Sequence, residues 1–159
     1  MIRRLKSDLD FRVTLWVHPF ASPFSASAWT AGADGSSLWL KGFPWPPGWP
    51  AFVSWWEGLG AVLDVTSPAA VGWFLGKLKH LRTRYGVDSF KFDAGESSLM
   101  PKWRLPSVAL DNPNEYTRHF VDIAYRLAPL FCSPLLHGVP FMRRCYNICA
   151  KFCTRITLK

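Results

Sequence analysis

The order of strand and helix patterns is the feature that most limits the fold of this chain. Residues 13–18 form an apolar run that suits a strand buried on both faces. Residues 89–92 alternate apolar with polar side chains after a turn at Gly86, which is typical of a second short strand. A helical pattern lies between the two segments. Strands that alternate with helices predict parallel βα units, and therefore an α/β fold.

Two helices can be placed from their capping residues. Ser67 suits an N-cap with Pro68 at the first helical position, and Gly86 suits the end of the same helix. Asn112 begins a second helix, with Pro113 after it and Glu115 completing a capping box. Apolar stripes follow at helical spacing: Val71, Phe74, Leu75, Leu78 and Leu81 in the first helix, then Tyr116, Phe120, Ile123, Ala124 and Leu127 in the second.

The remaining segments are shorter or lack a regular pattern. Residues 2–9 resemble the end of a helix, and residues 61–64 form a short extended segment. Residues 20–49 show no periodicity, and a loop of about thirty residues inside a compact unit is usually functional or disordered.

The net charge of +8 does not by itself indicate a nucleic-acid-binding protein. Up to Leu136 the chain has fourteen Lys and Arg against all eleven Asp and Glu, which leaves +3; the five basic residues after it have no acidic counterpart. This basic tail can attract nucleic acid without specificity, but no base-reading motif accompanies it. No cofactor is expected. No metal is expected either, because Cys145, Cys149 and Cys153 are four residues apart, unlike the ligands of zinc motifs.

The segment Ser89–Glu96 carries the candidate chemistry. Its strand ends on Asp93, and catalytic groups in a β/α barrel lie at the C-terminal ends of strands. Lys91 is two residues away on the same side of the strand, and Glu96 is a second acid three residues further on. Two structural alternatives remain open: Asp93 caps the next helix, or Lys91 pairs with Glu96 away from any substrate.

Four separated segments together resemble glycoside hydrolase family 31, and most closely its myogenesis-regulating glycosidase branch. The specific part is the string Lys-Phe-Asp-Ala-Gly-Glu at residues 91–96, and the resemblance covers about residues 1–127. It implies a partial (β/α)8 TIM barrel, roughly strands 3 to 4 with flanking helices, because a complete barrel needs about 250 residues. Residues 128–159 then form a separate basic tail. The matching segments are residues 9–20, 55–58, 63–68 and 88–96, with 114–117 beyond them.

The resemblance also implies a function. It is that of a retaining α-glycosidase, a hydrolase of O-glycosyl bonds in carbohydrate metabolism, with an α-galactoside as the substrate class. Asp93 matches the catalytic nucleophile, Lys91 and Trp56 match sugar-contacting positions, and Glu96 falls where a carboxylate or amide supports the nucleophile. The residue types agree, since an ammonium group keeps a neighbouring carboxylate ionised and an indole offers an apolar face to a sugar ring.

Structural roles compete with these assignments. Trp56 can equally belong to the core, Asp64 is expected to hold a turn or cap the helix at Ser67, and His18 at a strand end is more often structural than catalytic.

The chain also departs from the family pattern. The family's acid/base carboxylate lies two strands later, Asp10 replaces a glycine and should strain its turn, and residues 128–159 match nothing in the family. These departures suggest a truncated or mis-spliced product, or a fragmentary gene model. The alternative function is therefore a catalytically inactive polypeptide that at most binds a sugar weakly, or a membrane surface through a basic amphipathic helix at residues 141–156.

The compartment is left open. The start of the chain lacks a secretory signal, and no apolar run reaches the ~20 residues of a membrane span. The resemblance implies relatives that are often membrane-anchored with a lumenal catalytic domain.

Overall fold

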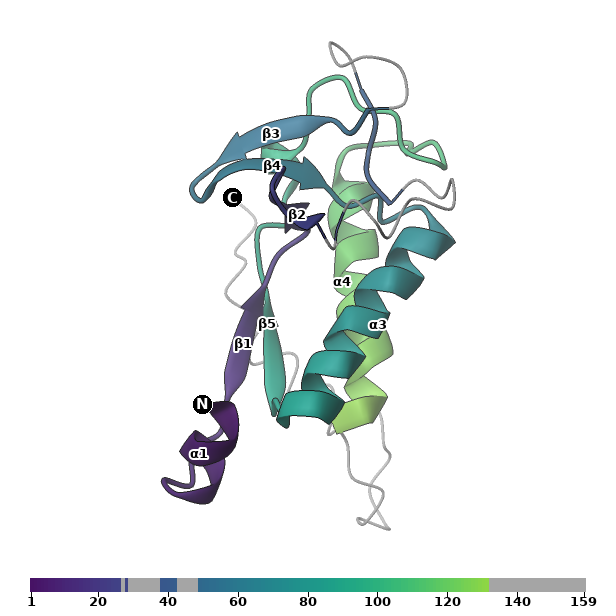
Figure 1. The fold of residues 1–159 in the computed structure, drawn as a ribbon. Coiled ribbons are helices and arrows are strands. Elements are labelled where there is room, and N and C mark those ends of the chain that lie inside the picture. Colours follow the sequence, from purple (N-terminus) through teal and green to yellow (C-terminus); the bar gives the residue numbers. More distant parts are fainter. Residues whose placement is uncertain (27, 29–37, 43–48, 132–159) are drawn as a thin grey trace, which may run out of the picture.

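The computed structural model describes residues 1–26, 28, 38–42 and 49–131, and Figure 1 shows how they are arranged. Two small sheets and two long helices make up this part of the chain. Its elements in order are α1 (Ile2–Ser7), β1 (Thr14–Val17), β2 (Phe20–Ala21), β3 (Phe52–Trp55), β4 (Gly58–Val62), α3 (Pro68–Tyr85), β5 (Ser89–Phe92), η1 (Ser97–Leu99) and α4 (Asn114–Phe131).

β1 and β5 form a parallel pair, as the alternation of strands and helices predicts. Thr14 is opposite Ser89, and Val17 is opposite Phe92. Helices α3 and α4 lie together on one side of this pair (Figure 1). The described strands do not close a barrel, so the fold is a partial α/β unit with two adjacent parallel strands.

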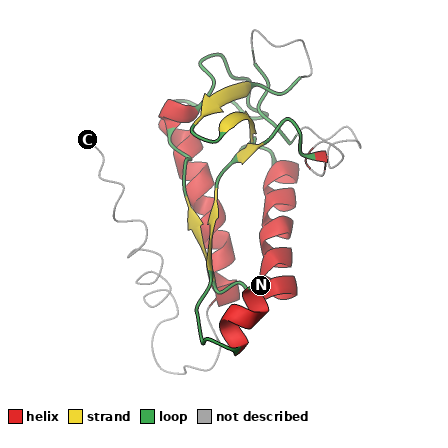
Figure 2. Cartoon of the chain, turned by 60° about the vertical axis from the view of Figure 1, so that its left-hand side comes forward, coloured by secondary structure: helices red, strands yellow, loops and turns green. Residues whose placement is uncertain are grey.

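A second, antiparallel sheet covers the C-terminal ends of β1 and β5. Its strand order is β2-β4-β3, and Figure 2 shows it at the opposite end of the molecule from α1. The extended segment predicted at 61–64 overlaps the end of β4, but residues 20–21, at the start of the segment 20–49 predicted as a loop, form β2. No strand was predicted at β3. The β3–β4 turn is Trp56-Glu57, with Trp55 opposite Gly58. It lacks the Asn-Gly or Asp-Gly signal by which such a hairpin is recognised.

Helix α3 has the predicted ends. The Ser67 side chain accepts a hydrogen bond from the Ala70 N–H, and Gly86 ends the helix in the left-handed conformation (φ 73°). The predicted stripe faces the core: Val71, Phe74 and Leu78 are buried, while Leu75 and Leu81 pack against the core partly buried. Local capping and periodicity were therefore enough to place this element.

Helix α4 begins slightly later than predicted, at Asn114. Asn112 accepts a hydrogen bond from the Asn114 N–H (3.0 Å), and Glu115 accepts one from the Asp111 N–H (2.8 Å). The reciprocal contacts of the predicted capping box are thus displaced by one residue. Four residues of the predicted stripe are buried in the core: Tyr116, Phe120, Ile123 and Leu127.

Tyr116 joins helix α4 to the antiparallel sheet. The Tyr116 hydroxyl donates a hydrogen bond to the Leu63 carbonyl (2.9 Å), just beyond the end of β4. Burial, aided by the charge of Asp64, raises the pKa of Tyr116 well above its usual value of 10.0. The hydroxyl therefore stays protonated and keeps donating at every ordinary pH.

Several predictions concern residues outside the described part. These are most of the basic tail, with Cys145, Cys149 and Cys153, and the amphipathic helix at 141–156. The predicted start of the tail at residue 128 instead falls within α4, which continues to Phe131. Within the described part, neither long helix is apolar enough over its length to cross a membrane.

Candidate active site

Asp93 follows directly after β5, at the C-terminal end of the parallel pair. Its N–H donates to the Val17 carbonyl (3.0 Å), which extends the ladder between β1 and β5 by one bond. The carboxylate is 38% exposed, so it is neither buried in the core nor fully solvated. The position agrees with the expected presentation of a catalytic group at the end of a parallel strand.

Three donors hold the Asp93 carboxylate. Lys91 Nζ and Trp16 Nε1 both lie 2.9 Å from Oδ2, and the Ala94 N–H donates to Oδ1 (3.0 Å). Lys91 therefore pairs with Asp93, and the alternative pairing of Lys91 with Glu96 is not found. Asp93 does not cap a following helix either. Trp16 was not singled out from the sequence, although it precedes His18 by two residues and so shares its face of β1.

The environment of Asp93 favours its ionised form. Partial burial by itself raises the pKa of Asp93, but hydrogen bonds from Lys91, Trp16 and Ala94 and the charge of Lys91 outweigh burial. The net result is a pKa below the ordinary value of 3.8. Asp93 is consequently a carboxylate at neutral pH, which is the form that a nucleophile needs.

The backbone after Asp93 is strained and closely packed. Ala94 has φ 59°, in the left-handed region that only glycine adopts readily. The next residue, Gly95, lies against helix α4, and its carbonyl accepts a hydrogen bond from Thr117 Oγ1 (2.9 Å). Strain of this kind persists only when the surrounding structure holds it, and it is frequent at functional sites.

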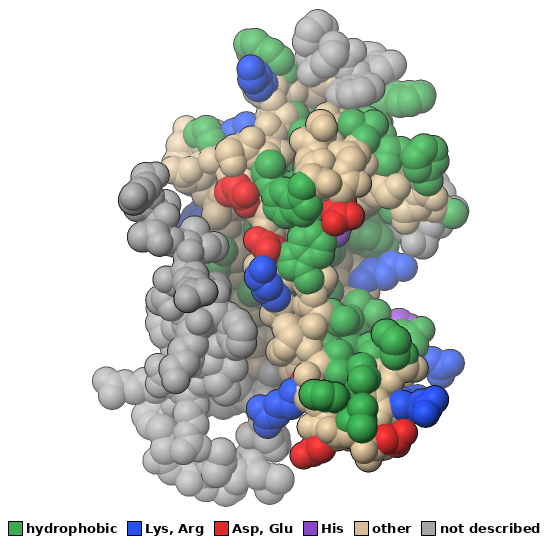
Figure 3. All heavy atoms as spheres, turned by 90° about the vertical axis from the view of Figure 1, so that its left-hand side faces the viewer, with side chains coloured by type: hydrophobic (Ala, Val, Ile, Leu, Met, Phe, Trp, Pro, Cys, Tyr) green, Lys and Arg blue, Asp and Glu red, His purple; other side chains and the backbone are tan. Residues whose placement is uncertain are grey.

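An aromatic cluster borders the carboxylate. It consists of Trp16, His18, Phe20, Trp55 and Trp56. Trp55 is at the centre of the cluster and contacts the other four rings. The ring centroid of Trp16 lies 4.8 Å from His18, 6.0 Å from Trp55 and 6.2 Å from Trp56. Figure 3 shows exposed apolar side chains on this face of the molecule, with acidic and basic side chains next to them.

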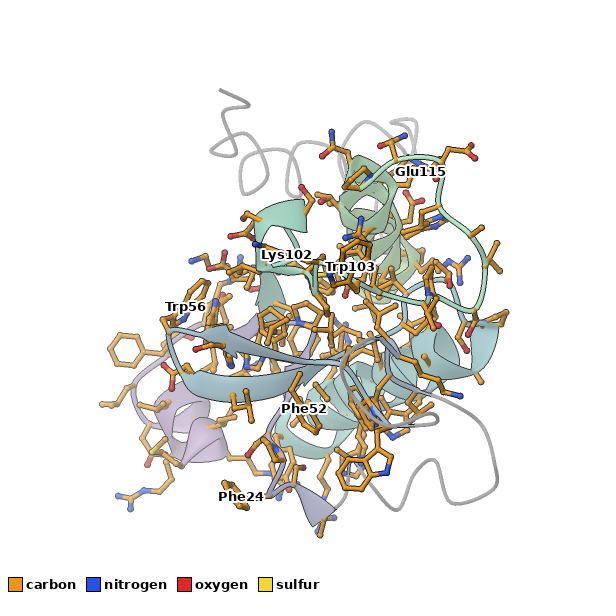
Figure 4. All side chains as sticks on the ribbon, turned by 90° about the horizontal axis from the view of Figure 1, so that it is seen from above. Phe24, Phe52, Trp56, Lys102, Trp103 and Glu115 are labelled. Atoms are coloured by element: carbon orange, nitrogen blue, oxygen red, sulfur yellow. The ribbon has the colours of Figure 1, made fainter. Side chains whose placement is uncertain are left out.

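Trp56 is the exposed member of the aromatic cluster. It is 58% exposed, so the alternative that Trp56 belongs to the core is wrong. Figure 4 shows Trp56 at the tip of the β3–β4 hairpin. The site thus has an indole surface beside a paired carboxylate.

His18 is held inside the aromatic cluster. The Phe20 N–H donates to His18 Nδ1 (3.3 Å), so the proton of the neutral ring is on Nε2. Burial lowers the pKa of His18 below 6.5, although the charges of Glu57 and Asp93 oppose this shift. His18 is therefore a neutral ring at pH 7, in accordance with its expected structural role.

The other expected residues are separate from Asp93. Glu96 is exposed at the start of η1, and its carboxylate makes no hydrogen bond or ion pair within the described residues. Asp64 is buried and accepts hydrogen bonds from the N–H and the hydroxyl of Thr66 (3.0 and 2.6 Å), so it holds a turn as predicted. No group of three or more potential metal ligands occurs in residues 1–26, 28, 38–42 and 49–131.

Comparison with known proteins gives a consistent result. Residues 1–133 match the sequence profile of the "Glycosyl hydrolases family 31 TIM-barrel domain". Over 125 residues the chain is 46% identical to the "Myogenesis-regulating glycosidase" of Mus musculus, an alignment that covers 78% of this chain and 17% of the mouse protein. The chain therefore spans about a sixth of the length of this relative.

Solved structures share the same fold. A GH31 family sulfoquinovosidase from E. rectale, in complex with an aza-sugar inhibitor, superimposes with a TM-score of 0.66 at 17% identity, over 81% of this chain and 19% of that one. The cycloalternan-degrading enzyme from Trueperella pyogenes, in complex with a covalent intermediate, gives 0.58 at 22% identity, over 82% and 18%.

Proposed function

The chain belongs to family 31 of the glycosyl hydrolases, and on that premise we propose that Asp93 is the nucleophile of a retaining α-glycosidase acting on α-galactosides. The observation that carries the proposal is the half-exposed Asp93 carboxylate, held by Lys91 and Trp16 beside an exposed indole. The α-galactoside class rests on the resemblance to the myogenesis-regulating branch.

The reaction follows from the ionised state of Asp93. One carboxylate oxygen attacks the anomeric carbon, the bond to the leaving-group oxygen breaks, and that oxygen takes a proton from a second carboxyl group. Water then cleaves the glycosyl ester and returns the Asp93 carboxylate. The covalent intermediate in the Trueperella pyogenes enzyme is consistent with this chemistry. We assign the acid/base role to none of the described residues.

The neighbours of Asp93 suit sugar binding. Lys91 has three N–H donors and a side chain that is 59% exposed, so donors remain for a sugar hydroxyl beyond the one that meets Asp93. Trp56 offers its face to the C–H side of a sugar ring. Glu96 is exposed and unpaired among the described side chains, so it can accept hydrogen bonds from hydroxyl groups further from the reacting carbon.

An activated aryl α-galactoside tests the proposal most directly. Its leaving group needs little acid assistance, so turnover depends on the nucleophile and not on a second carboxyl group that acts as the acid. We expect slow release of the phenol by the unaltered chain and complete loss in Asp93→Asn. Asp122→Asn is the matched control, because Asp122 lies on α4 and interacts with Arg118.

The same experiment judges the alternative function. Absence of turnover in all three proteins would contradict a working nucleophile in this chain. Galactose that still shifts the indole NMR signal of Trp56 would then support a catalytically inactive sugar-binding polypeptide. Vesicle co-sedimentation, with and without residues 137–159, tests the proposed membrane contact separately.

A further inference from the structure

We propose that Trp16 is a positioning residue for Asp93, which fixes the carboxylate relative to the indole of Trp56 through one hydrogen bond and one ring contact. The inference rests on the proposed function, because it concerns the same carboxylate and the same sugar-binding indole. It adds a residue that neither the sequence nor the family resemblance indicated.

The donor of the hydrogen bond, Trp16, lies on strand β1. Trp16 is opposite Lys91 in the parallel register of β1 and β5. Side chains opposite each other on neighbouring strands project from the same face of a sheet, so the indole and the ammonium reach the same oxygen, Asp93 Oδ2. Groups mounted on strands hold a reacting group more precisely than groups on loops.

The two donors on Oδ2 differ in kind. Lys91 is a charged, flexible side chain that is 59% exposed, whereas the indole is a flat neutral ring with a single donor direction. The ammonium chiefly supplies charge, and the indole N–H supplies direction. Loss of the indole N–H would leave the orientation of the Asp93 carboxylate less well fixed. A displacement of a reacting group by about 1 Å can lower a rate by about 10²-fold.

The ring contact links Trp16 to the indole of Trp56, which is the proposed sugar-binding surface. Trp16 stacks on Trp55 at 26° between ring planes, and its centroid lies 6.2 Å from that of Trp56. One side chain therefore touches both the carboxylate and the surface on which a sugar would lie. Trp16 is itself 39% exposed, so burial in the core does not explain its position.

The bond can be observed without any turnover, from the indole N–H signals in NMR spectra recorded across a pH titration. In the unaltered chain we expect the Trp16 signal to shift with the same midpoint as the Asp93 carboxyl carbon. This shift should disappear in Asp93→Asn. His18 belongs to the same aromatic cluster, and the charge of Glu57 acts on His18, so the variants His18→Gln and Glu57→Gln identify the contributions of these two residues.

Variants then separate the hydrogen bond from the ring. Trp16→Phe keeps an aromatic ring without the N–H donor, and we expect it to raise the pKa of Asp93. Trp73→Phe is the control, because Trp73 lies on α3 next to Lys77 and is not among the residues that shift the pKa of Asp93; it should leave that pKa unchanged. With an aryl glycoside, Trp16→Phe should lower kcat by about 10- to 100-fold and change KM less.

The outcomes distinguish this inference from the proposed function. The positioning role of Trp16 would be overturned, even in an active chain, by either of two results. One is a Trp16 indole N–H signal that does not shift as Asp93 titrates, and the other is an unchanged pKa of Asp93 in Trp16→Phe. Coupled titrations in a chain without turnover would instead support the Trp16–Asp93 bond and count against the glycosidase assignment.

Discussion

Asp64 and Ser107, 43 residues apart, are joined by two hydrogen bonds to one carboxylate oxygen. The N–H and the hydroxyl of Ser107 donate to Asp64 Oδ2 at 2.7 and 2.6 Å, while Thr66 bonds to the other oxygen. The buried Asp64 therefore ties the loop between β5 and α4 to the start of α3.

Replacement of Asp64 by Ala should destabilise the protein by about 3 kcal/mol, since several donors lose their acceptor and each unsatisfied buried donor costs about 1–3 kcal/mol. Ser107→Ala removes one donor and leaves the carboxylate bonded, so we expect a loss of about 1 kcal/mol. Urea unfolding at pH 7 measures both. Equal losses in the two variants would contradict the central role of Asp64.

Replacement of Gly95 by Ala should destabilise the protein by about 1–3 kcal/mol, the usual cost of overpacking. A Cβ atom at Gly95 would lie 2.1 Å from Cδ1 of the buried Phe120, so helix α4 or the strained Ala94 segment must shift. Gly72→Ala is the control: its Cβ meets nothing within 4 Å on the exposed side of α3, and it should stabilise by about 1 kcal/mol. A stabilised Gly95→Ala protein would show that the close approach is absent.

Replacement of Asp10 by Gly should stabilise the protein by about 1 kcal/mol. Asp10 has φ 52°, which is unfavourable for residues with a Cβ and which confirms the expected strain before β1. Asp10→Ala keeps the Cβ and loses the polar side chain, so it should not stabilise. The midpoints of urea denaturation compare the three proteins, and identical midpoints for the Gly and Ala variants would contradict this explanation.

Acid should weaken the end of the parallel pair that lies away from the candidate site. Hydrogen bonds from Lys6 and from the Val13 N–H lower the pKa of Asp88 below 3.8, despite an opposing effect of burial. The resulting stability is fully present above the ordinary Asp pKa and is lost as the pH falls through the lower pKa of the folded state. Asp88→Asn should therefore be less stable at pH 7 and lose less stability between about pH 5 and pH 2. Thermal unfolding of the unaltered protein and of Asp88→Asn across this pH range tests the prediction. If stability falls equally with pH in the two proteins, Asp88 is not the cause of the acid sensitivity.

The sequence alone determined the features that depend on neighbouring residues. Hydrophobic periodicity and capping residues predicted β1, β5, α3 and α4, because each is a property of a few consecutive residues. The strain at Asp10 was expected from the family resemblance, in which a glycine precedes the strand. The string at residues 91–96 indicated Asp93 and Lys91 for the same reason, since residues two apart on a strand share a face.

Only the tertiary structure decided which distant groups meet. The Trp16–Asp93 bond spans 77 residues and follows from the register of β1 against β5, which no local pattern encodes. The β3–β4 hairpin exposes Trp56 and brings it beside Trp16, although the hairpin lacks a recognisable turn signal. Side-chain contacts between strands depend on how whole elements pack, so they become defined only when the chain has folded.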